Sequence, residues 1–247
     1  FFGGMIIDTI PDIIMSGVSQ YSNFGISVSG AGDINGDGFS DVIVGANMFN
    51  SYKGRAYVYY GGVNMDNIPD VILNGEASGG SFGGTVAGGD LNNDGFSDLV
   101  IAAFSYNTDL FFQAGRVYIY YGDHIMDTVA DVVITGESAY SNLGHGTPGM
   151  GDVNGDGYCD IVLGAYYFNS GRGRAYVHFG GQNMDNIPDV VFSESGVSHG
   201  LGVCVSVVGD VNSDGFNDVV IGNGYTSSTG NAFLFYGGVN MDNEKDK

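Results

Sequence analysis

The sequence is poor in basic residues and has no long apolar run. Only 7 of its 247 residues are Lys or Arg, against 28 Asp and Glu, and the formal net charge is −21 at pH 7. A nucleic-acid-binding protein needs a basic surface, so this charge excludes nucleic acid as a partner and argues equally against an anionic membrane surface. Because no apolar segment is long enough to span a bilayer, we also expect no membrane insertion.

Cysteine, proline and tryptophan are also scarce. Cys159 and Cys204 occupy positions where the corresponding stretches of the chain have small residues, so we predict free thiols rather than a disulfide. The 4 prolines and 44 glycines exclude collagen and a disordered linker, and indicate many tight turns. The 16 Tyr and 16 Phe, with frequent Val and Ile, favour β-strands.

One nine-residue pattern occurs four times. Its first copy reads Asp-Ile-Asn-Gly-Asp-Gly-Phe-Ser-Asp, with oxygen-bearing side chains at positions 1, 3, 5 and 9 and glycine at position 6. These side chains can converge on one point, the glycine permits a sharp turn, and the main-chain carbonyl at position 7 can add another oxygen. The candidate metal ligands are Asp33, Asn35, Asp37, Phe39, Asp41, Asp90, Asn92, Asp94, Phe96, Asp98, Asp152, Asn154, Asp156, Tyr158, Asp160, Asp210, Asn212, Asp214, Phe216 and Asp218.

Calcium is the ion that this ligand set favours. The set contains no sulfur or imidazole, which disfavours zinc and copper, and a cage of protein oxygens suits calcium better than magnesium. Turn chemistry explains the glycine and one or two Asp or Asn residues, but three aspartates in every copy would repel one another without a cation. An EF-hand is excluded because its last ligand is a Glu at about position 12. We therefore predict about four Ca²⁺, one per copy, in a structural role.

The four loops belong to a repeat of 57 to 62 residues. Each copy contains a Phe-Gly or Leu-Gly pair, a short strand, the aspartate loop, a five-residue buried strand, an aromatic strand and a fourth strand after a turn. Four antiparallel strands per repeat are typical of the blades of a β-propeller. We predict an all-β chain, 1–247, that forms one β-propeller of four four-stranded antiparallel blades, with blade 1 at about 17–73, blade 2 at about 74–134, blade 3 at about 135–192 and blade 4 at about 193–238.

The phase of the repeat predicts how the ring closes. The sequence begins with the end of a third strand, supplies a fourth strand at 11–16, and ends without a fourth strand behind 232–236. The N-terminal strand can therefore complete the last blade and remove its exposed edge. Three alternatives stay open: a piece of a larger propeller, two chains joined in an eight-bladed ring, or self-association by strand exchange into a fibre.

The repeat resembles a known family. Phe24-Gly25, the loop from Asp33 to Asp41 and the following Val-Ile-Val-Gly-Ala run resemble the FG-GAP repeat, the blade unit of the integrin α-chain N-terminal propeller and its prokaryotic relatives. The resemblance covers essentially the whole chain. It implies calcium between the first and second strands of each blade, an extracellular or cell-surface setting, and adhesion or ligand recognition on the opposite face. Two departures are the family's usual seven blades and the replacement of Phe by Leu143 and Leu201.

The loops between the second and third strands are the candidate partner face. They carry aromatic side chains where polar turns are usual, which indicates a contact surface for a protein or glycan ligand, although packing between blades would also explain them. Strand alternation places these loops opposite the metal loops. The candidate partner-binding residues are Phe49, Tyr52, Tyr106, Asp109, Phe111, Phe112, Tyr166, Tyr167, Arg172 and Tyr225.

Motifs for catalysis are nearly absent. Gly-Val-Ser-His-Gly at 196–200 matches a nucleophile elbow in letters, but an elbow needs a helix after it and a strand is predicted there. The histidines fall at different positions of the repeat, and His178 replaces a strand tyrosine, so we expect it to be packed in the core. The leading hypothesis is a calcium-stabilised, non-catalytic recognition propeller. The alternatives are a structural subunit of an extracellular fibre or surface assembly, and a carbohydrate-binding lectin.

Overall fold

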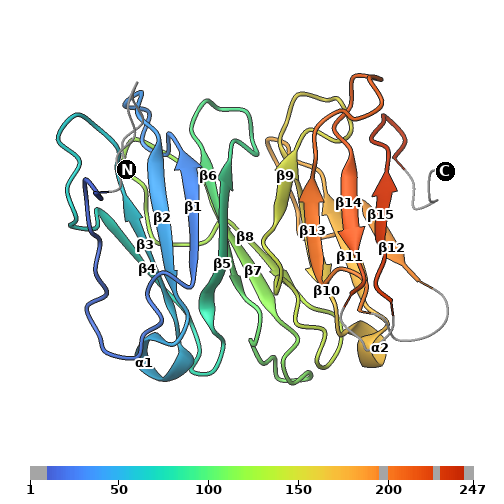
Figure 1. The fold of residues 1–247 in the computed structure, drawn as a ribbon, viewed down its shortest axis with the longest axis horizontal. Helices are drawn as coiled ribbons and strands as arrows, with labels where there is room; N and C mark the ends of the chain where they lie inside the picture. Colours follow the sequence, from blue (N-terminus) through green and yellow to red (C-terminus); the bar gives the residue numbers. More distant parts are fainter. Residues whose placement is uncertain (1–9, 195–199, 225–228, 242–247) are drawn as a thin grey trace.

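The computed structural model describes residues 10–194, 200–224 and 229–241, and these residues form four antiparallel sheets that stand side by side (Figure 1). The first sheet contains β1 (Ser27–Gly32), β2 (Asp41–Ala46), β3 (Arg55–Tyr59) and β4 (Val71–Asn74). The second contains β5 (Phe82–Gly89), β6 (Asp98–Ala103), β7 (Arg116–Tyr120) and β8 (Val132–Thr135). The third contains β9 (Gly149–Gly151), β10 (Asp160–Ala165), β11 (Arg174–His178) and β12 (Val190–Ser193). The fourth contains β13 (Cys204–Val207), β14 (Val219–Gly222) and β15 (Ala232–Phe235).

These sheets are the predicted blades, and the all-β propeller architecture is confirmed. In each sheet the strands pair in sequence order, and the first strands β1, β5, β9 and β13 lie next to one another from blade to blade. The four apolar runs predicted to be buried on both faces lie in β2, β6, β10 and β14. Every residue of β6 and β10 is buried, whereas β2 and β14 each keep one partly exposed residue, Val42 and Val220. The core lies between neighbouring blades, where β-branched side chains of one sheet pack against the next sheet.

A Phe-Gly or Leu-Gly pair joins the second, third and fourth blades each to the blade before it. Phe82 is buried, packs edge-on against the Tyr118 ring at 5.2 Å, and makes an isolated bridge to Gly54 of the preceding blade. The next residue, Gly83, has a φ of +77°, and an added Cβ would lie 2.3 Å from the main-chain oxygen of Arg55. Glycine is therefore required at Gly83 both by its backbone conformation and by the approach of a neighbouring strand.

Replacing Gly83 by Ala should lower the free energy of unfolding by about 4 kcal/mol. The substitution places a Cβ on a residue with a left-handed φ, which is strained, and that Cβ clashes with the neighbouring strand. Gly25 is a matched control, since it holds the same repeat position with a φ of +87° but has no atom within 4 Å of an added Cβ. We expect Gly25→Ala to cost about 1 kcal/mol, from the backbone conformation alone. Urea denaturation of both variants measures the difference, and equal costs would contradict the tight contact between blades.

The prediction that the N-terminal strand completes the last blade is wrong. Within the described residues the fourth sheet has three strands, and residues 11–16 form no strand. Instead Met15 packs against β2 and β3 of the first blade, and the Asn67 amide donates a hydrogen bond of 3.2 Å to the Ile14 carbonyl. The first and fourth sheets stand at opposite ends of the row (Figure 1). The proposed opening of the sequence in a third strand lies outside the described residues.

The remaining connections are short. The four-residue segments α1 (Phe49–Tyr52) and α2 (Phe168–Gly171) are turns rather than regular helices, because Asn50 and Ser51 have φ of 48° and 59°. No helix in the part of the chain described by the structure is long and apolar enough to cross a membrane. Cys159 and Cys204 are free thiols, as predicted.

Candidate functional site: aspartate loops and the opposite face

The first three ligand positions of each aspartate loop organise the loop backbone. Asp33 accepts hydrogen bonds from the N–H groups of Gly36 and Gly38, each at 2.8 Å. Asn35 and Asp37 face each other, with the Asn35 amide donating to the Asp37 carboxylate at 3.1 Å. The turn glycine at position 6 has a φ of +88° in Gly38, as the motif predicted. Side-chain oxygens of positions 1, 3 and 5 therefore gather at the tip of the loop.

Position 9 differs from the other three because it is buried. Asp98 has no exposed surface, and its two carboxylate oxygens accept N–H groups from Leu91 at 2.7 Å and Gly122 at 2.9 Å. These donors come from its own loop and from the β7–β8 connection. The same pair of bonds recurs at Asp41, Asp160 and Asp218. Position 9 thus joins two loops at the same end of each blade.

Burial raises the pKa of the position-9 carboxyl groups of the first three loops, Asp41, Asp98 and Asp160. The pKa of Asp98 and that of Asp160 rise to about 7, because desolvation disfavours the charged form and outweighs the backbone hydrogen bonds that favour it. The neighbouring carboxylates at positions 1 and 5 raise these pKa values further. Each loop therefore concentrates negative charge that a cation would stabilise.

The aspartate loops of successive blades are also linked to one another, which the sequence pattern did not indicate. The N–H at position 8 donates to the position-1 carbonyl of the preceding loop, as in Ser97 to Asp33 at 2.8 Å and Asn217 to Asp152 at 3.1 Å. The Phe96 ring covers Gly36 of the preceding loop, and Phe216 covers Gly155 in the same way. The aromatic residue at position 7 therefore packs between blades, in addition to offering its carbonyl.

The donor chemistry of the loops fits calcium. Each loop supplies three carboxylates and one amide oxygen, all hard ligands. Among the described residues, no three acidic, histidine or cysteine side chains are gathered closely enough to form a metal cluster. In the chain alone, the oxygens of positions 1, 3 and 5 accept hydrogen bonds from the loop, and position 9 turns inward. The twenty residues named above as metal ligands therefore stay a prediction.

The opposite end of the blades carries a continuous group of aromatic rings. The connections between second and third strands, including α1 and α2, lie there (Figure 1). Phe112 contacts Tyr140 at 5.3 Å between ring centroids, and Tyr140 in turn contacts Tyr167 at 6.5 Å. The three side chains are exposed. A hollow of about 520 Å³ beside them is lined by Gln113, Tyr140, Asn142, Tyr166, Tyr167 and Ser170.

The predicted partner residues divide into two groups. Phe49 and Tyr106 lie under the guanidinium groups of Arg55 and Arg116, at 3.7 and 3.9 Å from the ring centroids, so they pack within their own blades. Tyr166 is buried and Phe111 is partly buried, whereas the side chains of Tyr52, Asp109, Phe112, Tyr167 and Arg172 are exposed. Tyr225 lies outside the described residues, as does most of the 196–200 motif.

The candidate partner-binding residues did not include all members of this aromatic group. Tyr140 joins Phe112 to Tyr167, and His145 lies between Phe104 and Tyr166 at 5.1 and 4.7 Å. These residues come from the connection between blades rather than from the loop between second and third strands. The Tyr-Ser-Asn sequence shared by 21–23 and 140–142 was the available signal.

His178 is packed in the core, as predicted, with 2% of its surface exposed. Burial lowers its pKa to about 4, although the nearby Asp185 opposes that shift.

The buried His178 should make the stability of the protein depend on pH. Since His178 of the unfolded chain binds a proton near pH 6.5, the free energy of unfolding should fall by about 3 kcal/mol as the pH falls from about 6.5 to about 4. His178→Phe, which copies Phe235 of the last blade, should remove this loss. Urea midpoints of both proteins between pH 7.5 and 4.5 test it, and a constant difference would contradict the prediction.

Comparisons with known proteins agree with the repeat. A family model described as FG-GAP repeat matches residues 24–59 and 205–235, and one described as FG-GAP-like repeat matches residues 90–163. The chain is 36% identical to integrin alpha-5 of Xenopus laevis over 165 residues, which are 61% of this chain and 15% of that protein. It is 33% identical to phosphatidylinositol-glycan-specific phospholipase D of Bos taurus over 159 residues, 59% of this chain and 19% of that protein. The chain thus corresponds to a small part of either relative.

A solved structure shows the same fold. The exotype rhamnogalacturonan lyase YesX superposes with a TM-score of 0.52 over 84% of this chain and 38% of that chain, at 17% identity. At this identity the likeness concerns the fold alone. The relatives include enzymes as well as integrins, so similarity by itself does not assign or exclude catalysis.

Proposed function

Because the chain is an FG-GAP repeat propeller that resembles the N-terminal propeller of integrin α chains, we propose that it is a calcium-stabilised, non-catalytic module for adhesion or ligand recognition at the cell surface or outside the cell. The four aspartate loops supply the metal ligands and stabilise one end of the blades. The aromatic group at the other end supplies the contact surface.

The observation that supports this division most is the contrast between the two ends of the blades. At one end, three aspartates per loop are engaged in bonds to the scaffold. At the other end, Phe112, Tyr140 and Tyr167 are exposed and in contact with one another. Exposed, adjoining aromatic rings are typical of protein and glycan contact surfaces.

Attachment of cells of the encoding organism to the immobilised chain, with calcium present, tests the proposal. Phe112→Ser together with Tyr140→Ser should reduce attachment at least fivefold, because both exposed rings are removed. Ile125→Ser is the matched control, since Ile125 is 87% exposed but lies in the β7–β8 connection at the aspartate-loop end. Equal attachment of all three proteins, or none by the unaltered chain, would reject this face as the recognition surface.

A second candidate ligand is a carbohydrate. The hollow beside Tyr140 combines tyrosine rings with the amides of Gln113 and Asn142, groups that suit the apolar face and the hydroxyl groups of a sugar ring. A glycan array separates the two possibilities, because binding that is lost in Tyr167→Ser supports a lectin and a blank array favours a protein ligand.

A further inference from the structure

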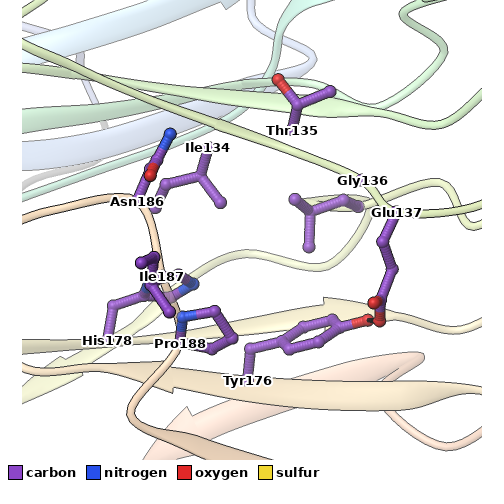
Figure 2. Close-up of a pocket in the computed structure, with 10 residues that line it drawn as sticks. Ile134, Thr135, Gly136, Glu137, Tyr176, His178, Asn186, Ile187 and Pro188 are labelled. Atoms are coloured by element: carbon purple, nitrogen blue, oxygen red, sulfur yellow. Dashed lines mark hydrogen bonds between the residues drawn. The ribbon is translucent and has the colours of Figure 1, made fainter.

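A pocket of about 230 Å³ lies between the second and third blades (Figure 2). Ile134, Gly136 and Glu137 line it from β8 and the segment after it. Tyr176 and His178 line it from β11. The remaining walls are formed by the apolar side chains of Leu143, Ile187 and Pro188 and by the polar Thr135 and Asn186.

Two substitutions in the repeat account for this space. Between the first and second blades, the corresponding interval holds the rings of Phe82 and Tyr120, both buried against Leu73 in one core cluster. Between the second and third blades, Leu143 stands in place of Phe82 and His178 in place of Tyr120. Both side chains are smaller than those they replace, so the interval loses volume on two sides.

The interval between the third and fourth blades shows how the loss can be compensated. It also carries a leucine, Leu201, at the Phe-Gly position. There the side chains of Phe192 and Phe235 fill the interval, with ring centroids 4.3 Å apart. In the second interval, Ile134 occupies the position of Phe192 and His178 occupies the position of Phe235. Neither of the two compensating phenylalanine rings is therefore present there.

One buried polar atom of the pocket has no hydrogen-bond partner among the described residues. His178 is buried, and its Nδ1 has no hydrogen-bond partner within residues 10–194, 200–224 and 229–241. The other polar groups are engaged, since the Tyr176 hydroxyl donates to the Glu137 carboxylate at 2.6 Å and Arg174 pairs with that same carboxylate. A buried nitrogen without a partner is costly, and a ligand that supplies one gains affinity from it.

We propose that this pocket binds a small phenolic molecule, whose ring occupies the space left by the missing aromatic side chains and whose hydroxyl pairs with Nδ1 of His178. The size is suitable, because an apolar protein cavity of about 150 Å³ accommodates benzene. Apolar side chains with a small number of polar groups between them, of which only His178 offers an unpartnered buried atom, are typical of sites for small ligands. The paired Glu137 and Arg174 leave no net charge in the wall, which favours a neutral ligand over an ion.

Isothermal titration calorimetry with p-cresol tests the proposal directly. The unaltered chain should bind p-cresol at a single saturable site, and toluene, which lacks the hydroxyl, about tenfold more weakly. His178→Tyr and Leu143→Phe each restore a side chain found in the first interval, and either should weaken p-cresol binding at least tenfold. If His178→Tyr fails to fold, Leu143→Phe alone gives the same result, with circular dichroism as the check on folding.

His145→Tyr is the matched control, because it makes the same substitution at a histidine that contacts the aromatic face and does not line the pocket. Its p-cresol affinity should equal that of the unaltered chain. The proposal is overturned if the unaltered chain shows no saturable binding, or if both pocket-filling variants bind p-cresol as tightly as the control. Equal affinity for toluene and p-cresol would overturn the role assigned to His178.

Discussion

Removing calcium with EGTA should lower the melting temperature of this chain by about 20 °C or more. A ligand present at 100 times its dissociation constant contributes about 2.7 kcal/mol per site, so four sites approach about 10 kcal/mol. For a domain of this size each kcal/mol corresponds to about 2–4 °C. The physical cause is the repulsion among three aspartates in each loop, which returns when the cation leaves.

Differential scanning calorimetry in calcium, in EGTA, and in EGTA with added magnesium measures this effect. Magnesium should restore little of the lost stability, because a cage of protein oxygens does not supply the octahedral geometry it requires. Identical melting temperatures in calcium and EGTA would reject the metal assignment for all four loops.

Replacing Asp98 by Ala should lower the free energy of unfolding by about 3 kcal/mol even without calcium. The substitution leaves the buried N–H groups of Leu91 and Gly122 without an acceptor, each costing about 1–3 kcal/mol, while relieving the burial of a carboxylate. Asp98→Asn should cost less, since one acceptor oxygen remains. Urea denaturation in EGTA measures these values without a contribution from metal binding.

Asp94→Ala provides the comparison within the same loop. Asp94 accepts the exposed N–H of Phe96, so in EGTA its loss should cost less than about 1 kcal/mol. In calcium both substitutions should be strongly destabilising, because both residues are candidate ligands. If Asp94→Ala and Asp98→Ala cost the same in EGTA, position 9 has no role apart from the metal.

The strands and the loops could be predicted because their signals are local. The apolar runs that become β6 and β10 differ from their surroundings within six residues, and the aspartate loops are complete within nine. The inward orientation of Asp98 depends on Gly122, a donor 24 residues away in another loop. No pattern in the loop itself carries that information.

The differences between the sequence predictions and the structure have the same physical origin. Phe49 and Tyr106 were assigned to the partner face because aromatic residues in a turn suggest a contact, but an arginine at the start of the next strand covers each ring. The phase of the repeat predicted a strand at 11–16 that completes the last blade, but residues 11–16 form no strand and Met15 packs against the first blade. The pocket at His178 is formed by side chains of two neighbouring blades. It becomes evident only when the packing between these blades is compared with the packing between the other blades.

The succession of blades, each joined to the next by a Phe-Gly or Leu-Gly bridge, makes this a one-dimensional array. In such an array stability is close to a sum of blade terms and nearest-neighbour interface terms, so the two inner blades, with an interface on each side, should open at a higher free energy than either end blade. Unfolding then proceeds inward from the ends. Among the described residues, we expect the second and third blades, each flanked by two of these bridges, to be the last to lose amide protection.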